Sequence, residues 1–301
     1  MPDSASPFTP ADLAVVRRAY ARQMLALLDV RNKAIEAAYA TVPRELFLGP
    51  PPWRISSPYA GYRDLPDADP VLVYQDILFA LDRARGVNNG SPSLHAKLLD
   101  ALGPRPGDRI AHIGAGAGYY TAILSELVGP SGQVTAVEFD PVLADQARRN
   151  LADRSNVSVV VGDGALWPQQ SADGVYVNYA VARPADSWID NLAQGGRLVF
   201  PLGVPGQPRS DVGGRHSDRG AAFRIERRPE GFAARAVSMA YFVWAEGALS
   251  DLDTADIARL RESFERGRLG DVRSLVWKAP ARADRCWFAG DGWALCFDEV
   301  Q

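Results

Sequence analysis

The stretch Asp108-Arg-Ile-Ala-His-Ile-Gly-Ala-Gly-Ala-Gly118, followed by Tyr119-Tyr-Thr-Ala-Ile-Leu-Ser-Glu-Leu-Val128, determines how the rest of the chain is interpreted. Its apolar first part predicts a short buried strand, its three glycines a tight turn, and its last ten residues an amphipathic helix. A strand, a glycine turn and a helix in this order present backbone N–H groups at a helix N-terminus. A ligand can approach those groups closely because glycine has no Cβ, so the stretch predicts a binding site for a nucleotide-like ligand.

The remaining chain repeats this alternation of strand and helix, which predicts an α/β fold with a doubly wound, mostly parallel sheet. We expect strands at 108–113, 133–139, 157–161, 174–180 and 196–201. We expect the helices between them at about 118–128, 141–153 and 184–193.

Three segments are expected along the chain. They are an N-terminal helical segment with a substrate-side loop (1–80), a ligand-binding core (81–249) and a small C-terminal α+β appendage (250–301). In the first, the prolines and glycines of 49–62 argue against a regular element, and 71–74 and 77–81 are expected as short strands. The stretch 203–220 has no apolar periodicity and is expected to be a lid or a disordered loop.

Composition and charge argue against several classes of protein. The 301 residues are 47% hydrophobic and 23% charged, and the net charge of -3 gives no field that would attract nucleic acid or an anionic membrane. No apolar run is long enough for a membrane span, and Met1–Ser6 does not resemble a signal peptide. The three histidines are scattered and near no cysteine pair, so no metal site is expected.

The two cysteines lie in a predicted hairpin with Asp291-Gly292 at its turn. A regular two-residue turn would place Cys286 opposite Phe297 and Cys296 opposite Trp287, so that the two thiols point to opposite faces. We therefore expect no disulfide, and from this a reduced protein of the cytoplasm.

The spacing of the glycines selects among nucleotide-like ligands. The chain lacks the G-x-x-x-x-G-K-[S/T] pattern of a phosphate loop, and Tyr119 stands where a dinucleotide site would have its third glycine. Glu138 ends the second strand, where a carboxylate can bind ribose hydroxyls, and Asp163-Gly164 follows the third strand, where an acid can accept from an adenine amino group. Together these residues predict S-adenosylmethionine, with S-adenosylhomocysteine as the product.

Several stretches together resemble the protein-L-isoaspartate O-methyltransferase family of class I S-adenosylmethionine-dependent methyltransferases, which have a Rossmann-like fold. The resemblance covers about residues 12–245, and the matching stretches are Val42–Phe47, His112–Tyr119, Val134–Glu138, Gly162–Gly164 and Gly195–Gly203. The chain departs from the family at His112, where the family has an acid. It departs again at Gly90, where the spacing from Pro92 places the family's serine.

The resemblance and the residues together give a set of expected site residues. The residues expected to bind the cofactor are His112, Gly114, Gly116, Gly118, Tyr119, Glu138, Asp163 and Gly164. Asn88, Asn89 and Ser91 are expected to orient the methyl acceptor, whereas His95 is interpreted as a packed or solvated residue.

The expected activity is methylation of a carboxyl group, in an isoaspartyl residue or another peptide or protein aspartate. A carboxylate is already ionised at neutral pH and needs alignment more than a base. Two alternatives remain open: a small-molecule hydroxyl or acid as acceptor, and a catalytically silent protein that binds cofactor or a partner. The acceptor would then be a peptide, a protein or a small molecule, with no nucleic acid or membrane as partner.

Overall fold

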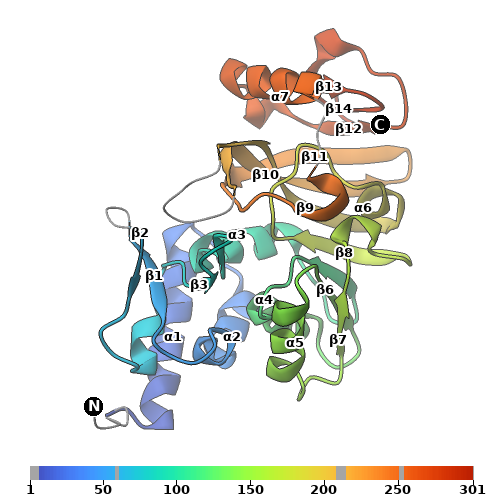
Figure 1. Ribbon diagram of the computed structural model, residues 1–301. Helices are drawn as coiled ribbons and strands as arrows, with labels where there is room; N and C mark the ends of the chain where they lie inside the picture. Colours follow the sequence, from blue (N-terminus) through green and yellow to red (C-terminus); the bar gives the residue numbers. More distant parts are fainter. Residues whose placement is uncertain (1–6, 58–60, 208–214, 251–253, 301) are drawn as a thin grey trace.

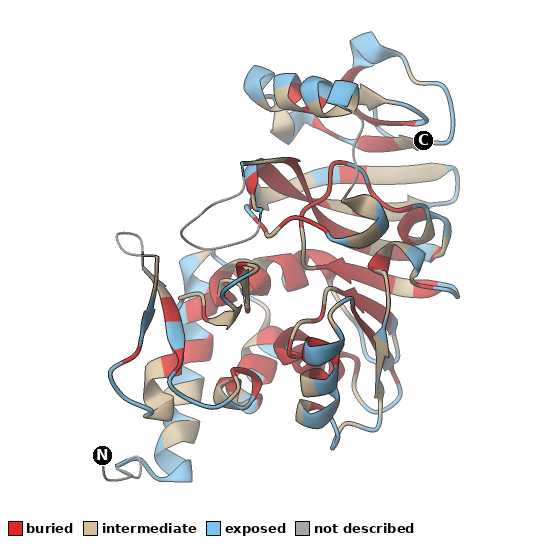
Figure 2. Ribbon diagram, in the orientation of Figure 1, coloured by how far each residue is buried: buried red, intermediate tan, exposed pale blue. Residues whose placement is uncertain are grey.

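One large sheet dominates this computed structural model, which describes residues 7–57, 61–207, 215–250 and 254–300 (Figure 1). Within those ranges its ten strands lie in the order β13-β14-β12-β11-β10-β9-β8-β5-β6-β7. Figure 2 shows the buried residues concentrated in the central strands and in the helices that pack on them. None of the helices in these ranges combines the length and apolar character that crossing a membrane requires.

The parallel half of the sheet is the predicted α/β core. β5 pairs in parallel with β6 and β8, β6 with β7, and β8 with β9. Its strands are β5 (Arg109–Ile113), β6 (Gln133–Glu138), β7 (Val157–Val161) and β8 (Ala172–Val177). The helices of this half are α3 (Pro92–Leu102), α4 (Tyr119–Val128), α5 (Pro141–Asn150) and α6 (Asp186–Asp190). The doubly wound fold is therefore confirmed, with α6 shorter than the 184–193 expected from sequence.

The antiparallel half begins with β9 (Leu192–Pro205), β10 (Ser217–Arg228) and β11 (Gly231–Met239). Residues 203–220 were expected to lack regular secondary structure, but both ends of that stretch belong to strands. Ser217 pairs with Pro205, because the two long strands continue their ladder toward the connection. The centre of the stretch lies outside the described residues, so the expected lid stays a prediction.

The last segment continues this sheet. β12 (Ser274–Trp277) pairs with β11 through Phe232–Leu275 and Ala233–Ser274, and β14 (Trp293–Cys296) and β13 (Cys286–Gly290) follow. α7 (Thr254–Arg266) packs against β13, where Phe264 lies 5.0 Å from Trp287 between ring centroids. Trp287 in turn contacts Phe223 of β10 at 5.8 Å, so one hydrophobic core spans the boundary proposed near residue 250.

The N-terminal segment packs two helices beside the parallel half. α1 (Pro10–Leu27) begins with a capping box between Thr9 and Asp12, and α2 (Lys33–Thr41) begins at the Asn32 cap. A 3-10 turn (Arg44–Phe47) follows, and its Arg44 is fully buried and donates to the carbonyls of Val73, Gln75 and Ile77.

Two expectations in this segment were wrong. Residues 49–62 contain strand β1 (Arg54–Ser57), which pairs with β2 (Gly61–Asp64). The expected strand at 71–74 is mostly a 3-10 turn (Pro70–Val73), because Pro70 starts it and Asp69 caps it. The next strands are β3 (Ala80–Asp82) and β4 (Val87–Asn88), which form a short hairpin.

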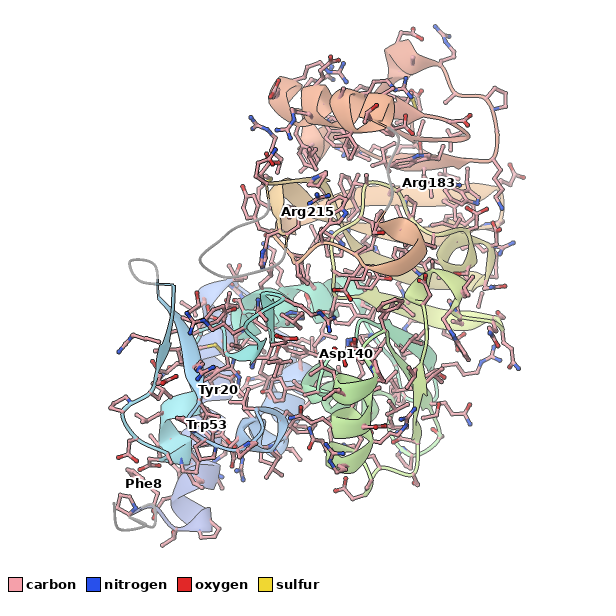
Figure 3. The ribbon with its side chains drawn as sticks, in the orientation of Figure 1. Phe8, Tyr20, Trp53, Asp140, Arg183 and Arg215 are labelled. Carbon is pink, nitrogen blue, oxygen red and sulfur yellow. A yellow bond between two sulfur atoms is a disulfide. The ribbon has the colours of Figure 1, made fainter. Side chains whose placement is uncertain are left out.

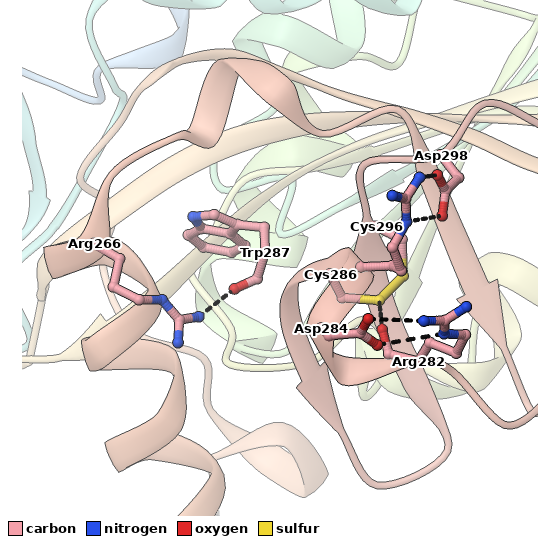
Figure 4. Close-up of a disulfide and its surroundings, with 8 residues drawn as sticks. Arg266, Arg282, Asp284, Cys286, Trp287, Cys296 and Asp298 are labelled. Atoms are coloured by element: carbon pink, nitrogen blue, oxygen red, sulfur yellow. Dashed lines mark hydrogen bonds and ion pairs between the residues drawn. A yellow bond between two sulfur atoms is a disulfide. The ribbon is translucent and has the colours of Figure 1, made fainter.

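The expectation of two free thiols was also wrong, because Cys286 and Cys296 form a disulfide (Figure 4). The turn keeps the expected register near its tip, where Gly290 pairs with Trp293. A β-bulge at Trp287 then shifts the register by one residue, so that Cys286 lies opposite Cys296 on the same face. The cytoplasmic location stays a prediction, and the cysteines no longer support it.

Candidate functional site

A cavity of about 630 Å³ opens at the carboxyl ends of the parallel strands. Ligands bind at this edge in sheets of this kind, because the strand order reverses there and the connecting loops diverge. The cavity is walled by the glycine turn after β5, the end of β6, the β3–β4 hairpin, the start of α3 and the chain after β11. Among the described residues, no cluster of three His, Cys, Asp or Glu side chains could hold a metal ion.

The glycine turn has backbone dihedral angles that other residues would adopt only with strain. Gly114 has a φ of 74°, and a Cβ there would lie 2.8 Å from the ring of Tyr179. Gly118 has a φ of 96° at the start of α4, and a Cβ there would lie 2.8 Å from Leu151. Gly114 and Gly116 line the cavity, whereas Gly118 acts behind it by letting α4 pack against α5. The turn therefore combines an open cradle with close helix packing.

Glu138 is the buried carboxylate of the cavity. Its Oε2 accepts from the Gly116 N–H at 2.7 Å, and its Oε1 accepts from the Asp140 N–H at 3.0 Å. Burial raises the pKa of Glu138 above its ordinary value, although the N–H donors of Asp140 and Gly116 favour the charged form. The side chain is thus held at the end of β6 with its oxygens beside the glycine turn, where the hydroxyls of a ribose can bind.

Asp163 lies behind the cavity wall, whereas Gly164 lines it. One oxygen of Asp163 accepts from the Ala165 N–H at 2.9 Å, and the other accepts from the Ala248 N–H at 2.7 Å. Ala248 belongs to the 3-10 turn Gly247–Leu249, which follows β11. The carboxylate that is expected to accept from an adenine amino group therefore already accepts a hydrogen bond from the chain on the C-terminal side of the core.

His112 has no exposed surface and does not line the cavity. Its Nδ1 lies 2.7 Å from Thr121 Oγ1, and its Nε2 lies 2.7 Å from Asn178 Nδ2. Burial lowers the pKa of His112 to about 3, so the ring is neutral. Asn178 lines the cavity and connects His112 to it, and the expected contact between His112 and a ligand stays a prediction.

The residues expected to orient the acceptor all line the cavity. Asn88 Oδ1 accepts from the Gly90 N–H at 2.9 Å, which shapes the turn. Ser91 caps α3 and donates to Asp76 at 2.9 Å, so its hydroxyl already has partners. Asn89 is buried, and its Oδ1 accepts from the Phe79 N–H at 2.9 Å. Among the described residues its Nδ2, which is also buried, has no partner.

Tyr119 lines the cavity as expected, and so do Arg85, Glu246 and His95, which were not among the expected binding residues. Arg85, in the turn of the β3–β4 hairpin, donates to Asp140 at the N-terminus of α5, a position labelled in Figure 3, and to both oxygens of Glu246. No local pattern points to this contact. The third, His95, lies in the first turn of α3, a position that could have indicated that it faces the preceding loop.

Comparisons with known proteins agree with this geometry. Residues 29–219 match the family model described as protein-L-isoaspartate(D-aspartate) O-methyltransferase (PCMT). A protein-L-isoaspartate O-methyltransferase of Aeropyrum pernix is 37% identical over 58% of this chain and 62% of its own length. Enzymes with the same name from Ignicoccus hospitalis and Methanothrix thermoacetophila are 30% and 34% identical, over 95% and 89% of their lengths.

The solved structures show the same fold. A protein-L-isoaspartate O-methyltransferase structure covers 86% of this chain and 73% of its own, with a TM-score of 0.61 and 24% identity. A putative family member from Plasmodium falciparum, in complex with S-adenosyl-L-homocysteine, covers 76% of this chain and 98% of its own. Its TM-score is 0.57 and its identity 15%.

Proposed function

The chain belongs to the protein-L-isoaspartate O-methyltransferase family of S-adenosylmethionine-dependent enzymes, and on that premise we propose that it methylates the free α-carboxyl group of isoaspartyl residues in peptides or proteins. The observation that carries the proposal is the cavity itself. Its wall contains Gly114, Gly116 and Glu138, which suit a cofactor, and also Asn89, whose Nδ2 has no partner among the described residues.

The residues of the cradle fit S-adenosylmethionine. Glu138 offers carboxylate oxygens to a ribose diol, and Gly114 and Gly164 keep the wall free of side chains, since a Cβ at either position would collide with Tyr179. Asn178, oriented by His112, supplies a polar group at the same wall. When bound, S-adenosylmethionine supplies a sulfonium methyl group, whose carbon–sulfur bond breaks as a carboxylate oxygen forms its bond to that carbon.

The chemistry needs alignment and water exclusion from the protein, since a carboxylate nucleophile has no proton to lose. Two buried histidines, His95 at the cavity and His112 behind Asn178, suit this requirement. Burial lowers the pKa of His95 well below its ordinary value and that of His112 to about 3, so neither ring carries a charge that would compete with the sulfonium for the acceptor.

The proposal is tested with a synthetic isoaspartyl peptide, its aspartyl twin and a panel of small hydroxy and carboxylic acids. With radiolabelled S-adenosylmethionine, we expect base-labile methyl ester on the isoaspartyl peptide and at least tenfold less on the other acceptors. Preferential labelling of the aspartyl twin or of a small molecule would show that this acceptor, and not isoaspartate, is the substrate. Cofactor binding with no labelled acceptor would instead favour a silent binding protein.

A further inference from the structure

Gly90 and His95 share one space at the acceptor end of the cavity. Gly90 has a φ of 71°, and a Cβ on it would lie 2.2 Å from His95 Nε2. The imidazole therefore fills the place that any side chain at position 90 would take. The ring is 2% exposed and lines the cavity, and it stacks on Tyr120 with the ring centroids 3.7 Å apart. Its position is thus fixed by packing.

The position of the proton on His95 follows from its other nitrogen. Nδ1 lies 2.6 Å from the hydroxyl of Tyr176, a residue with no exposed surface. His95 is the one hydrogen-bond partner of that hydroxyl among the described residues, and a buried O–H that donates to nothing is costly. The hydroxyl therefore donates to Nδ1, which places the ring proton on Nε2. Burial keeps the ring neutral by lowering the pKa of His95.

A second donor lies next to Gly90 in the chain. The Asn89 side chain has a defined orientation, because its Oδ1 accepts from the Phe79 N–H at 2.9 Å. Its Nδ2 is buried and has no partner among the residues that the structure describes, and Asn89 as a residue lines the same cavity wall. A buried donor without an acceptor is unfavourable, so this position is suited to a ligand that brings an acceptor oxygen.

We propose that His95 Nε2 and Asn89 Nδ2 form the acceptor-binding pair, which donates to one oxygen of the acceptor carboxylate and leaves the other oxygen free to attack. The proposal rests on the proposed function and narrows it. Both atoms donate and neither can accept a proton, so the pair selects a carboxylate, which is already ionised, over a hydroxyl, which would need a base. Tyr176 is a positioning residue, because it acts only by holding the His95 tautomer.

The test measures binding without turnover. An isoaspartyl peptide is titrated by calorimetry into the protein saturated with S-adenosylhomocysteine. H95F keeps a ring on Tyr120 and removes the donor, and we expect a rise of about tenfold in the peptide Kd. H95Q, whose amide can restore a donor, should recover part of the loss. N89D keeps the bond from Phe79 and adds a negative charge, so it should weaken binding more than H95F does.

Two controls separate these effects from damage to the fold. The affinity for S-adenosylhomocysteine should stay within twofold of wild type in all three variants. Nitrogen NMR of His95 should show the proton on Nε2, and Y176F should shift the population toward the other tautomer while raising the peptide Kd.

The outcomes distinguish the two proposals. If wild type binds the isoaspartyl peptide and H95F and N89D bind it within twofold as well, the pair is overturned and the proposed function stands. A proton on Nδ1 would also overturn the pair. If wild type binds the cofactor product but no isoaspartyl peptide, the proposed function falls, and the pair falls with it.

Discussion

Arg85 and Glu246 are 161 residues apart in the chain, yet Arg85 Nη2 donates to Glu246 Oε2 at 2.8 Å beside the cofactor cradle. The guanidinium also donates to Asp140 at the start of α5. Because Glu246 directly precedes the 3-10 turn whose Ala248 N–H binds Asp163, the chain after β11 is held at two points near Asp163, where we expect the adenine ring. We expect a ligand to pass this segment when it enters or leaves.

The fastening should slow release of the cofactor product. We expect E246Q to raise the dissociation rate of S-adenosylhomocysteine by up to about fivefold, since a partly exposed ion pair contributes about 0.2–1 kcal/mol. In wild type the rate should also rise with salt, and it should do so less in E246Q, because salt screens this pair. Stopped-flow fluorescence measures both. E299Q, which removes the exposed partner of Arg273, is the matched control, and equal rates in the two variants would exclude the fastening.

A serine at position 90 should conflict with His95. G90S places a side chain at a φ of 71° and against the imidazole, whereas G267S adds the same side chain at a φ of 70° with nothing within 4 Å of its Cβ. Both should lose about 1–3 kcal/mol from backbone strain, and G90S more. The additional loss of stability in G90S should be smaller in the H95A background, which lacks the ring. Urea denaturation of the four combinations at 90 and 95 measures the coupling, and additive effects would contradict the shared space.

Stability should fall on acidification because His112 is buried as a neutral ring. Its pKa is about 3 in the folded protein and near its ordinary 6.5 when unfolded, so only the unfolded chain takes up the proton between these values. The contribution is fully present above pH 6.5 and is lost toward pH 3, with a slope of up to about 1.4 kcal/mol per pH unit. His95 acts in the same direction. Denaturation of wild type and H112Q at several pH values should show a shallower slope in the variant, and parallel slopes would contradict this.

The disulfide should stabilise the C-terminal hairpin without affecting the cofactor site. Its cysteines are 10 residues apart, and closing a loop of this size contributes about 2–3 kcal/mol in the chain-entropy description. We expect C286S/C296S to unfold at a lower temperature and to bind S-adenosylmethionine as wild type does. Reduction of wild type should reproduce the shift and leave the variant unchanged. An unfolding temperature that neither the substitutions nor reduction changes would show that the disulfide does not contribute to stability.

The parts of the fold that were predicted correctly are those encoded by neighbouring residues. The glycine turn, the alternating strands and Glu138 follow from patterns within a few residues. The predictions were wrong where contacts between segments distant in the chain determine the local structure. The bulge at Trp287, which brings the cysteines together, depends on how that ring packs against Phe223 and Phe264, and the hairpin sequence alone does not show it.

The candidate site divides in the same way. Asn89 could be placed at the cavity because it lies in the loop before α3. The orientation of His95 could not be predicted, because it depends on Tyr176, 81 residues later in the chain. The expected contact of Asp163 with the ligand stays a prediction, and its bond from the Ala248 N–H could not be predicted, because that group is 85 residues away in the chain.

The continuity of the sheet from β11 into β12 has a consequence for solubility. Without residues 254–300, β11 would become the outermost strand, and its backbone at Phe232 and Ala233 would lose the pairing with β12 and expose unsatisfied hydrogen-bonding groups. The face of β10 that carries Phe223 would also lose its Trp287 cover. The C-terminal segment thus shields part of this edge from edge-to-edge aggregation, and β13, a strand of only 5 residues, forms the border of the sheet instead.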